Sequence, residues 1–226
     1  MDTFCEGRLK MAIQLQQKDI KKIFIQFAET FTKEKDFLND LDSKIGDGDH
    51  GLSMSRGFNA VMETIEKIPD LTISDMLTKG GMQFNEVTGS TIGILIFSAM
   101  RAAGLAVKDK ATINLQDLQN MLHASIEAIK KRGKASKGQK TILDSLIPTL
   151  EYLEKQNAQI EESLIIKGMI KKAFEGAEST KKLKSQIGRA KWFSDRSVGV
   201  IDPGAYTGYL ILNTIGEYIT KIFQFK

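Results

Sequence analysis

The apolar residues of this chain recur with a helical period along almost its whole length, and this pattern constrains the fold more than any other feature. Amphipathic helices require apolar residues three and four positions apart. The clearest stripes are Ile20, Ile23, Phe24, Phe27, Ala28 and Phe31; Leu115, Leu118, Leu122, Ile126 and Ile129; Ile142, Leu143, Leu146, Ile147, Leu150 and Leu153; and Leu210, Ile211, Ile215, Ile219 and Phe223. Only three prolines occur among the 226 residues. We therefore predict an all-α fold.

Four less regular helical stretches complete the pattern, at 52–66, 73–84, 91–107 and 161–184. Together with the four stripes they give eight helices. No repeat, low-complexity tract or linker rich in proline and serine separates them. We therefore predict a single helical domain.

Composition and charge pattern exclude several classes of protein. The uncharged stretch from Val87 to Met100 is shorter than the roughly 20 apolar residues of a membrane-spanning helix. The N-terminus carries Asp2 and Glu6 where a signal peptide has a basic start and an apolar run, so we expect a cytoplasmic protein. Cys5 is the only cysteine, which excludes an internal disulfide and a cysteine-rich zinc site.

The basic balance is mild. The net charge is +4, the cationic residues are spread along the chain, and aromatic residues make up 8% of it. This distribution is a weak argument for nucleic-acid binding. We expect neither nucleic acid nor membrane as a partner, and the charge suits a phosphorylated ligand or an acidic protein.

Glycines gather in alternate connections between the predicted helices. The clusters are Gly46, Gly48, Gly51 and Gly57; Gly80, Gly81, Gly89 and Gly93; Gly133 and Gly138; and Gly188, Gly199, Gly204 and Gly208. Alternate connections of antiparallel helices lie at the same end of a bundle. Helices commonly end at glycine, which explains any single cluster. The alternation nevertheless favours a ligand site built from four loops at one rim.

The loop from Leu41 to Gly51 holds the strongest chemical signal. Asp42, Asp47 and Asp49 lie within it among three glycines. Carboxylates held this close repel one another unless a cation neutralises them, and oxygen ligands suit magnesium or calcium. A solvated acidic turn is the alternative, because Asp-Gly pairs also favour turns.

Calcium in an EF-hand loop does not fit the register of these residues. Counting from Asp42 places Lys44 and Gly46 at ligand positions, and counting from Asp47 places Leu52 where the turn glycine belongs. Magnesium remains, and it commonly shares its coordination sphere with phosphates. The sequence therefore predicts a magnesium site with a nucleotide as second ligand.

A helix start at Gly51 to Ser53 offers backbone amides that can receive a phosphate. The chain has no P-loop, because Gly133-Lys134-Ala135 lacks the hydroxyl residue that this motif needs. Any phosphate site must therefore use another design.

The segment Ile45-Gly-Asp-Gly-Asp-His-Gly51 resembles the signature of the dihydroxyacetone kinase L subunits, the nucleotide-binding component of those kinases. Further segments match in order: Met54, Arg56 and Gly57; Thr88-Gly89-Ser90-Thr91; Arg132 to Thr141 with Asp144; and Gly188-Arg189-Ala190, Arg196-Ser197 and Asp202-Pro203-Gly204-Ala205. The similarity covers about residues 18 to 223. It makes residues 18–226 the family domain and residues 1–17 an N-terminal extension.

The resemblance implies an antiparallel, up-and-down barrel of eight helices with ADP or ATP at one rim. It implies that Asp42, Asp47 and Asp49 hold two magnesium ions. It places His50, Gly51, Leu52, Ser53, Ser90 and Thr91 on the phosphate and ribose side, and Gly133, Ile142, Arg189, Asp202, Pro203 and Gly204 around the rest of the nucleotide. Thr88 and Ile92 stand where the family usually has glycine.

The resemblance also implies a function that needs partners. The family transfers the terminal phosphate to dihydroxyacetone or a related short ketose held by a K-type subunit. A lone L-type unit favours recharging of bound ADP by a phosphohistidine carrier, the M-type subunit, of the phosphoenolpyruvate phosphotransferase system. An ATP-dependent kinase subunit and a non-catalytic helical module remain as alternatives.

We expect no catalytic residue on this chain, because the covalent substrate histidine of the family belongs to the separate subunit. His50 is then a neighbour of the phosphates, and His123 is expected to be structural. The predicted contact zone for an acidic partner is an exposed surface around four lysines, Lys134, Lys137, Lys140 and Lys191.

Overall fold

The computed structural model describes residues 13–157 and 159–224, and these confirm the all-α fold. The described α-helices are α1 (Gln17–Lys33), α2 (Lys35–Ser43), α3 (His50–Lys67), α4 (Ile73–Thr88), α5 (Thr91–Ala106), α6 (Leu115–Gly133), α7 (Leu143–Leu153), α8 (Glu162–Ser179) and α9 (Pro203–Gln224). Two 3-10 helices, η1 (Thr180–Lys182) and η2 (Arg189–Ser197), lie between α8 and α9.

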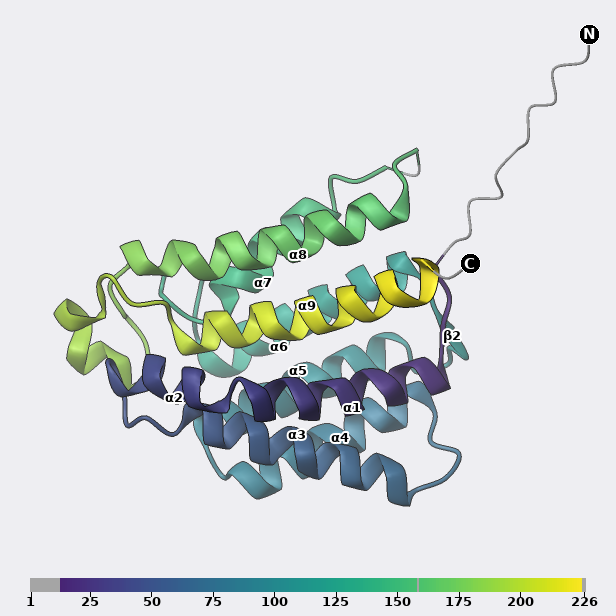
Figure 1. Ribbon diagram of the computed structural model, residues 1–226, viewed down its shortest axis with the longest axis horizontal. Helices are drawn as coiled ribbons and strands as arrows, with labels where there is room; N and C mark the ends of the chain where they lie inside the picture. Colours follow the sequence, from purple (N-terminus) through teal and green to yellow (C-terminus); the bar gives the residue numbers. More distant parts are fainter. Residues whose placement is uncertain (1–12, 158, 225–226) are drawn as a thin grey trace, which may run out of the picture.

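The helices close into a ring around one hydrophobic core. From α3 to α9 each helix packs against the next, α9 packs against α1, and α1 packs against α3. Figure 1 shows α8, α9, α1 and α3 side by side in this order. Residues from all of these helices contribute to the same buried cluster. The predicted antiparallel barrel is therefore confirmed.

The prediction of eight helices missed α2. The predicted first stripe, Ile20 to Phe31, lies within α1, which ends before Glu34, where the backbone (φ −86°, ψ 1°) leaves the helical region while the N–H still donates to the carbonyl of Thr30; α2 follows directly and was not predicted. This helix buries only Leu38 and Leu41, too few positions to show a helical period. Asp42 lies in the last turn of this helix, so the acidic segment begins in regular structure.

Two other helix boundaries differ from the predicted ones. The stretch predicted over 161–184 ends as an α-helix at Ser179, and η1 continues it for one turn. The last helix begins at Pro203, well before the first residue of its apolar stripe, Leu210. Proline is well suited to a first helical position, because its missing N–H has no partner there in any case.

A two-residue pairing secures the beginning of the described chain. β1 (Leu15–Gln16) pairs antiparallel with β2 (Thr112–Ile113), with Leu15 opposite Ile113. Ile13 and Leu15 are buried in the core. The last residues of the predicted extension thus pack on the domain, and residues 1–12 lie outside the described residues.

The four glycine-rich connections lie at one end of the barrel, as predicted. They join α2 to α3, α4 to α5, α6 to α7, and α8 to α9. In Figure 1 this end is on the left, where α2, η2 and the start of α9 meet. Among the described helices, none is both long and apolar enough to cross a membrane.

An aromatic cluster joins α1, α3 and α4 in the core. Phe58 stacks on Phe31 with ring centroids 4.6 Å apart and meets Phe84 edge-on at 5.0 Å. Gly57 lies against the ring of Phe84, where a Cβ atom would overlap it. Phe84 is fully buried, whereas Met82 on the same helix is 57% exposed.

Phe84→Ala should lower the free energy of unfolding by about 3–5 kcal/mol, because it removes a buried ring and leaves a cavity. Met82→Ala is the matched control and should change it by about 0.5 kcal/mol or less. Urea unfolding followed by circular dichroism measures both. Equal effects of the two substitutions would contradict this account of the core.

Candidate metal and nucleotide site

The carboxylate of Asp42 organises the first loop of the rim. Its Oδ2 accepts backbone N–H groups from Gly48 (2.9 Å), Asp49 (3.1 Å) and His50 (3.3 Å). Gly48 has a φ of +78°, a left-handed conformation that favours glycine. The loop therefore folds back over the end of α2 and delivers the chain into α3.

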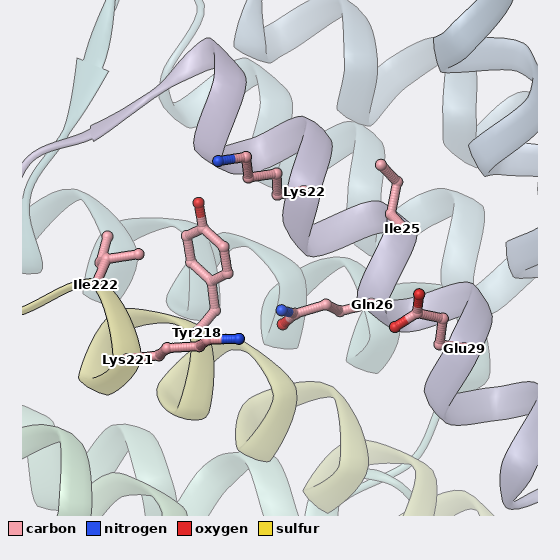
Figure 2. Close-up of a pocket in the computed structure, with 7 residues that line it drawn as sticks. All are labelled: Lys22, Ile25, Gln26, Glu29, Tyr218, Lys221 and Ile222. Carbon is pink, nitrogen blue, oxygen red and sulfur yellow. The ribbon is translucent and has the colours of Figure 1, made fainter. Parts of the chain in front are cut away.

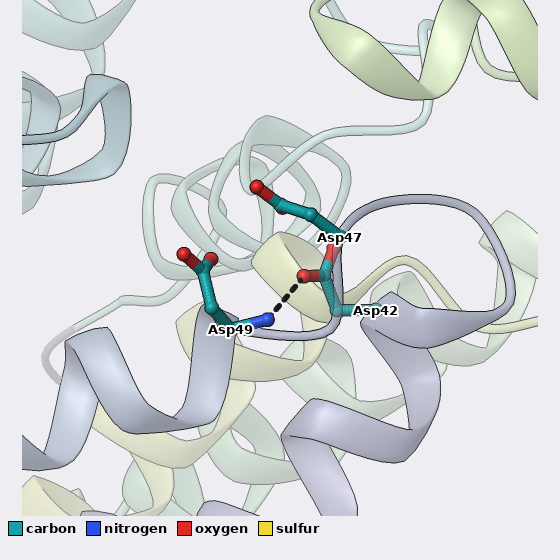
Figure 3. Close-up of side chains that lie close together, drawn as sticks. All are labelled: Asp42, Asp47 and Asp49. Atoms are coloured by element: carbon teal, nitrogen blue, oxygen red, sulfur yellow. Dashed lines mark hydrogen bonds between the residues drawn. The ribbon is translucent and has the colours of Figure 1, made fainter.

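This fold brings the three predicted metal ligands together. Asp42, Asp47 and Asp49 each offer a carboxylate oxygen, and these atoms all lie within 4.8 Å of one another. Figure 3 shows the three side chains gathered at the start of α3. Asp42 is half-buried, and Asp47 and Asp49 are exposed. Three negative charges at this spacing create a strong local demand for a cation.

The donor set fits magnesium. Magnesium takes oxygen ligands at about 2.1 Å, so opposite ligands of one ion lie about 4.2 Å apart and a small movement would close these carboxylates on it. Oδ2 of Asp42 already accepts three N–H groups, so Oδ1 is its oxygen with capacity for a cation. The exposure of Asp47 and Asp49 leaves room for water and phosphate oxygens.

The first turn of α3 is less open to a phosphate than predicted. The N–H of Leu52 donates to Oδ1 of Asn39 (3.1 Å), and that of Ser53 donates to the carbonyl of Asp49 (2.9 Å). Gly51 is needed for packing, since a Cβ atom there would overlap the carbonyl oxygen of Lys35. The expectation that the amides of Leu52 and Ser53 receive a phosphate therefore does not fit this geometry.

His50 connects the start of α3 to α9. Its Nε2 forms a hydrogen bond with Oγ1 of Thr207 on α9 (2.8 Å). Burial lowers the pKa of its imidazole to about 4, so the ring is neutral at neutral pH. The sequence analysis did not find Thr207, because nothing in its local pattern separates it from an ordinary helical threonine. His123, expected to be structural, is exposed.

The second loop is a tight connection between α4 and α5. Gly89 ends α4 with a φ of +53°, and Oγ of Ser90 caps α5 by accepting the N–H of Gly93 (3.3 Å). Thr91 is the first, exposed residue of α5. Thr88, which departs from the family pattern, donates its hydroxyl to the carbonyl of Phe84 (2.9 Å), so its polar group is satisfied within its own helix.

Asp144 holds the third loop in place. Its Oδ1 accepts the N–H of Gly138 (2.5 Å), and its Oδ2 accepts that of Thr141 (2.7 Å). Gly133 ends α6 beside Leu95 of α5, which places the second and third loops close together. Ile142 is buried at the start of α7.

The fourth loop returns to the core at Asp202, which is buried. Its Oδ2 accepts the N–H of Ala205 (2.7 Å), and its own N–H donates to Oγ1 of Thr180 (2.9 Å). Burial raises the pKa of this carboxyl to about 7; the Ala205 N–H and Lys140 oppose the shift, and the carboxylates of Asp144 and Asp42 add to it. These influences show that residues from three loops meet at one place.

The remaining predicted nucleotide contacts lie around the same place. Pro203 is the first residue of α9, and Gly204 lies beside Ile142 of the third loop. The side chain of Arg189 lies outside the part of the chain that the structure describes.

One predicted surface lysine is not on the surface. Lys140 is 3% exposed, and its ammonium donates to the carbonyls of Thr180 (2.7 Å), Ser197 (2.8 Å) and Val200 (2.6 Å). The predicted contact zone of four exposed lysines is therefore wrong at this position. The local sequence does not indicate that Lys140 is buried, because it belongs to a basic, glycine-containing run that is typical of an exposed loop.

A family model described as the DAK2 domain matches residues 44–217. The chain belongs to the DAK2 domain family. The resemblance to the dihydroxyacetone kinase L subunits is thereby confirmed.

Two curated relatives that match most of this DAK2 domain are named as ADP-binding subunits of dihydroxyacetone kinases. The chain is 33% identical over 193 residues to the "PEP-dependent dihydroxyacetone kinase 2, ADP-binding subunit DhaL" of Listeria innocua, covering 84% of this chain and 88% of that protein. It is 33% identical over 194 residues to the "PTS-dependent dihydroxyacetone kinase, ADP-binding subunit DhaL" of Lactococcus lactis, covering 86% and 93%. The similarity thus spans nearly the full length of both relatives.

A crystal structure supports the fold. The dihydroxyacetone kinase from C. freundii, in complex with AMP-PNP and Mg²⁺, superposes with a TM-score of 0.67 at 21% identity. The match covers 96% of this chain and 36% of that protein, so this DAK2 domain spans about a third of it.

This DAK2 domain also has a surface groove. It lies between α1 and α9 and is lined by Lys22, Glu29, Tyr218 and Lys221 among others (Figure 2). The hydroxyl of Tyr218 donates to Oδ1 of Asp19 (2.8 Å). The lining mixes charges of both signs and has no group of carboxylates. The candidate metal site is therefore the rim and not this groove.

Stability should depend on the protonation of His50. Its pKa is lowered from 6.5 to about 4, so protons bind more strongly to the unfolded chain between these values. The free energy of unfolding of the wild type should therefore fall relative to that of His50→Gln as the pH decreases, by about 2 kcal/mol between pH 7 and 4.5.

Urea unfolding in a chelator at the two pH values measures this difference. The raised pKa of Asp202 acts in the opposite direction, but it is present in both chains and cancels in the comparison. His123→Gln is the matched control, because His123 is exposed, and it should follow the wild type. Parallel pH profiles for wild type and His50→Gln would contradict the assignment.

Proposed function

We propose that this chain, through its domain at residues 18–226, is the nucleotide-binding subunit of a dihydroxyacetone kinase. It binds ADP or ATP with magnesium and passes the terminal phosphate to dihydroxyacetone or a related short ketose held by a K-type partner. The observation that carries the proposal is the convergence of Asp42, Asp47 and Asp49 within 4.8 Å at the glycine-rich rim.

The three aspartates would bind the metal from different environments. Asp42 is fixed by three backbone N–H groups, so it presents its second oxygen from a rigid position. Asp47 and Asp49 are exposed and supply the remaining charge at the open side. When bound, magnesium neutralises phosphate charge, which is what phosphoryl transfer chiefly requires.

Two ions suit this arrangement better than one. Each magnesium ion is usually held by only one or two carboxylates and completes its sphere with water and phosphate oxygens. Asp42, Asp47 and Asp49, whose oxygens lie within 4.8 Å of one another, would together hold two ions, which would supply the positive charge that phosphates need. We propose this arrangement for the loaded site.

The other rim loops enclose the nucleotide. The proposed lining of the phosphate side is His50, Gly51, Leu52 and Ser53 with Ser90 and Thr91; Leu52 and Ser53 contribute their side chains, because their amides are already bonded. The proposed enclosure of the rest of the nucleotide consists of Gly133, Ile142, Arg189, Asp202, Pro203 and Gly204. The position of Gly204 beside Ile142 supports this enclosure, because it brings the third and fourth loops together.

The substrate and phosphate donor come from partner subunits. His50 is bonded to Thr207 and does not act as a nucleophile. The relatives named above are PEP-dependent and PTS-dependent subunits of nearly the same length, which supports a phosphohistidine carrier as donor. Of the four lysines of the predicted contact zone, Lys140 is buried and Lys137 pairs with Glu151; the proposal keeps Lys134 and Lys191, which are exposed, as cations that steer an acidic partner.

Magnesium and ADP should stabilise the chain only together. A ligand at a hundredfold excess over its Kd adds about 2.7 kcal/mol to the free energy of unfolding. The melting temperature should therefore rise with magnesium plus ADP and stay unchanged with ADP plus chelator. Asp49→Asn should abolish the rise, whereas Asp40→Asn should retain it, because Asp40 is an exposed partner of Lys44. A full rise in Asp49→Asn would refute the metal assignment.

Reconstitution tests the transfer itself. The chain is mixed with a dihydroxyacetone-binding K-type subunit and with either a phosphohistidine carrier plus phosphoenolpyruvate or ATP, and ketose phosphate is measured. We expect product with the carrier, and none from the chain without the K-type subunit. Product with ATP alone would identify an ATP-dependent kinase subunit. No product with either donor, despite nucleotide binding, would identify a non-catalytic module.

A further inference from the structure

Lys140 is a charged side chain buried inside the rim. It is 3% exposed and lies in the third loop, with a left-handed backbone (φ +61°) that side chains rarely adopt. Burial lowers the pKa of its ammonium, and the neighbouring carboxylates of Asp202 and Asp144 oppose that shift. A charged group is retained in such a place only when its surroundings satisfy it closely.

The surroundings of Lys140 are the base of the fourth loop. The ammonium donates to the carbonyls of Thr180, where the chain leaves α8, and of Ser197 and Val200, where it returns. An ammonium has three donors, so these three carbonyls use its full capacity. Removing the ammonium would leave these carbonyls without this partner in a buried place.

Backbone contacts close the same base. The N–H of Gly199 donates to the carbonyl of Lys181 (2.8 Å), and the N–H of Ser185 donates to Oγ of Ser197 (2.9 Å). The tip of the loop is exposed: Lys184 pairs with Asp195 (2.7 Å), and Trp192 is 87% exposed. Lys140 therefore holds both ends of the exposed fourth loop, at Thr180 and at Ser197 to Val200.

We propose that Lys140 is the positioning residue of the nucleotide site, coupling the third loop to the base of the fourth so that both enclose the same nucleotide. This inference rests on the proposed function. Asp144 supports it by accepting the N–H groups of Gly138 and Thr141 on either side of Lys140. The fourth loop carries the proposed contacts Arg189 and Asp202, so its position decides whether they reach the ligand.

Lys140→Met removes the cation and keeps an unbranched side chain. Lys137→Met is the matched control, because Lys137 lies in the same loop but is exposed and pairs with Glu151 (2.7 Å). Hydrogen exchange without nucleotide should show faster exchange in residues 183–202 of Lys140→Met, with α4 and α5 unchanged. Unchanged exchange in 183–202 would overturn the proposal whether or not the chain binds nucleotide.

Calorimetry of magnesium plus ADP, at a temperature where circular dichroism shows both variants folded, tests the link to the site. The affinity of Lys140→Met should fall about tenfold, as expected if the competent arrangement of the loop falls to about a tenth of the population. A purely structural role would leave the affinity of the folded protein unchanged. Equal affinities of Lys140→Met and wild type would overturn the proposal. If the wild type does not bind ADP, the proposed function is overturned, and with it the link between Lys140 and the nucleotide.

Chemical rescue keeps the test decisive if Lys140→Met does not fold. Cys5 is the only cysteine, so Lys140→Cys in a Cys5→Ser background can be alkylated in denaturant with 2-bromoethylamine and refolded. The product carries an ammonium on a side chain of nearly lysine length. It should regain the protection of 183–202 and the ADP affinity. A refolded, alkylated protein that regains neither would overturn the proposal.

Discussion

The rim of this barrel depends on a balance between carboxylates and the groups that hold them. Asp42 accepts three consecutive N–H groups and so fixes the turn that brings Asp47 and Asp49 beside it. The turn brings three carboxylates together, and the three N–H groups do not neutralise this negative charge. A cation is the physical complement of this geometry, and phosphates are the natural further ligands of that cation.

The barrel brings the other three glycine-rich loops to the same end as the acidic loop. Because consecutive helices run antiparallel and the ring closes through α9 and α1, four connections meet at one end. Individual contacts join them: His50 bonds to Thr207, and Gly204 lies beside Ile142. A second small buried cluster, formed by Leu41, Ala177, Ile201 and Ala205, ties the ends of α2 and α8 to the start of α9. The site is thus built on helix ends fixed by packing.

The charges of the rim are arranged in two layers. The outer layer is the exposed pair Asp47 and Asp49, open to ligands. The inner layer is buried and contains Asp202, Asp144 and Lys140; burial raises the pKa of Asp202 and lowers that of Lys140, and the charge of each of these two opposes the shift of the other. Buried charges are tolerated when each has hydrogen-bond partners, and such networks specify a unique arrangement of the segments that carry them.

Sequence patterns predicted the helices well, because the period of apolar residues is a local property. They failed at α2, where only Leu38 and Leu41 are buried, and at the start of α9, where the apolar stripe begins late. The pattern of the acidic loop predicted which carboxylates would meet. It did not show that the amides of Leu52 and Ser53 are already bonded, because one acceptor belongs to α2 and the other to the helix itself.

The sequence by itself determined the all-α class, the alternate glycine-rich loops, the three aspartates of the candidate metal site and the family motifs, all of which are encoded within short stretches of chain. Only the tertiary structure decided that Lys140 is buried and that burial lowers the pKa of His50. The acceptors of Lys140 are 40, 57 and 60 residues away in the sequence, and the partner of His50 is 157 residues away. Burial and pKa depend on which distant segments meet, and that meeting is fixed by the closure of the helical ring.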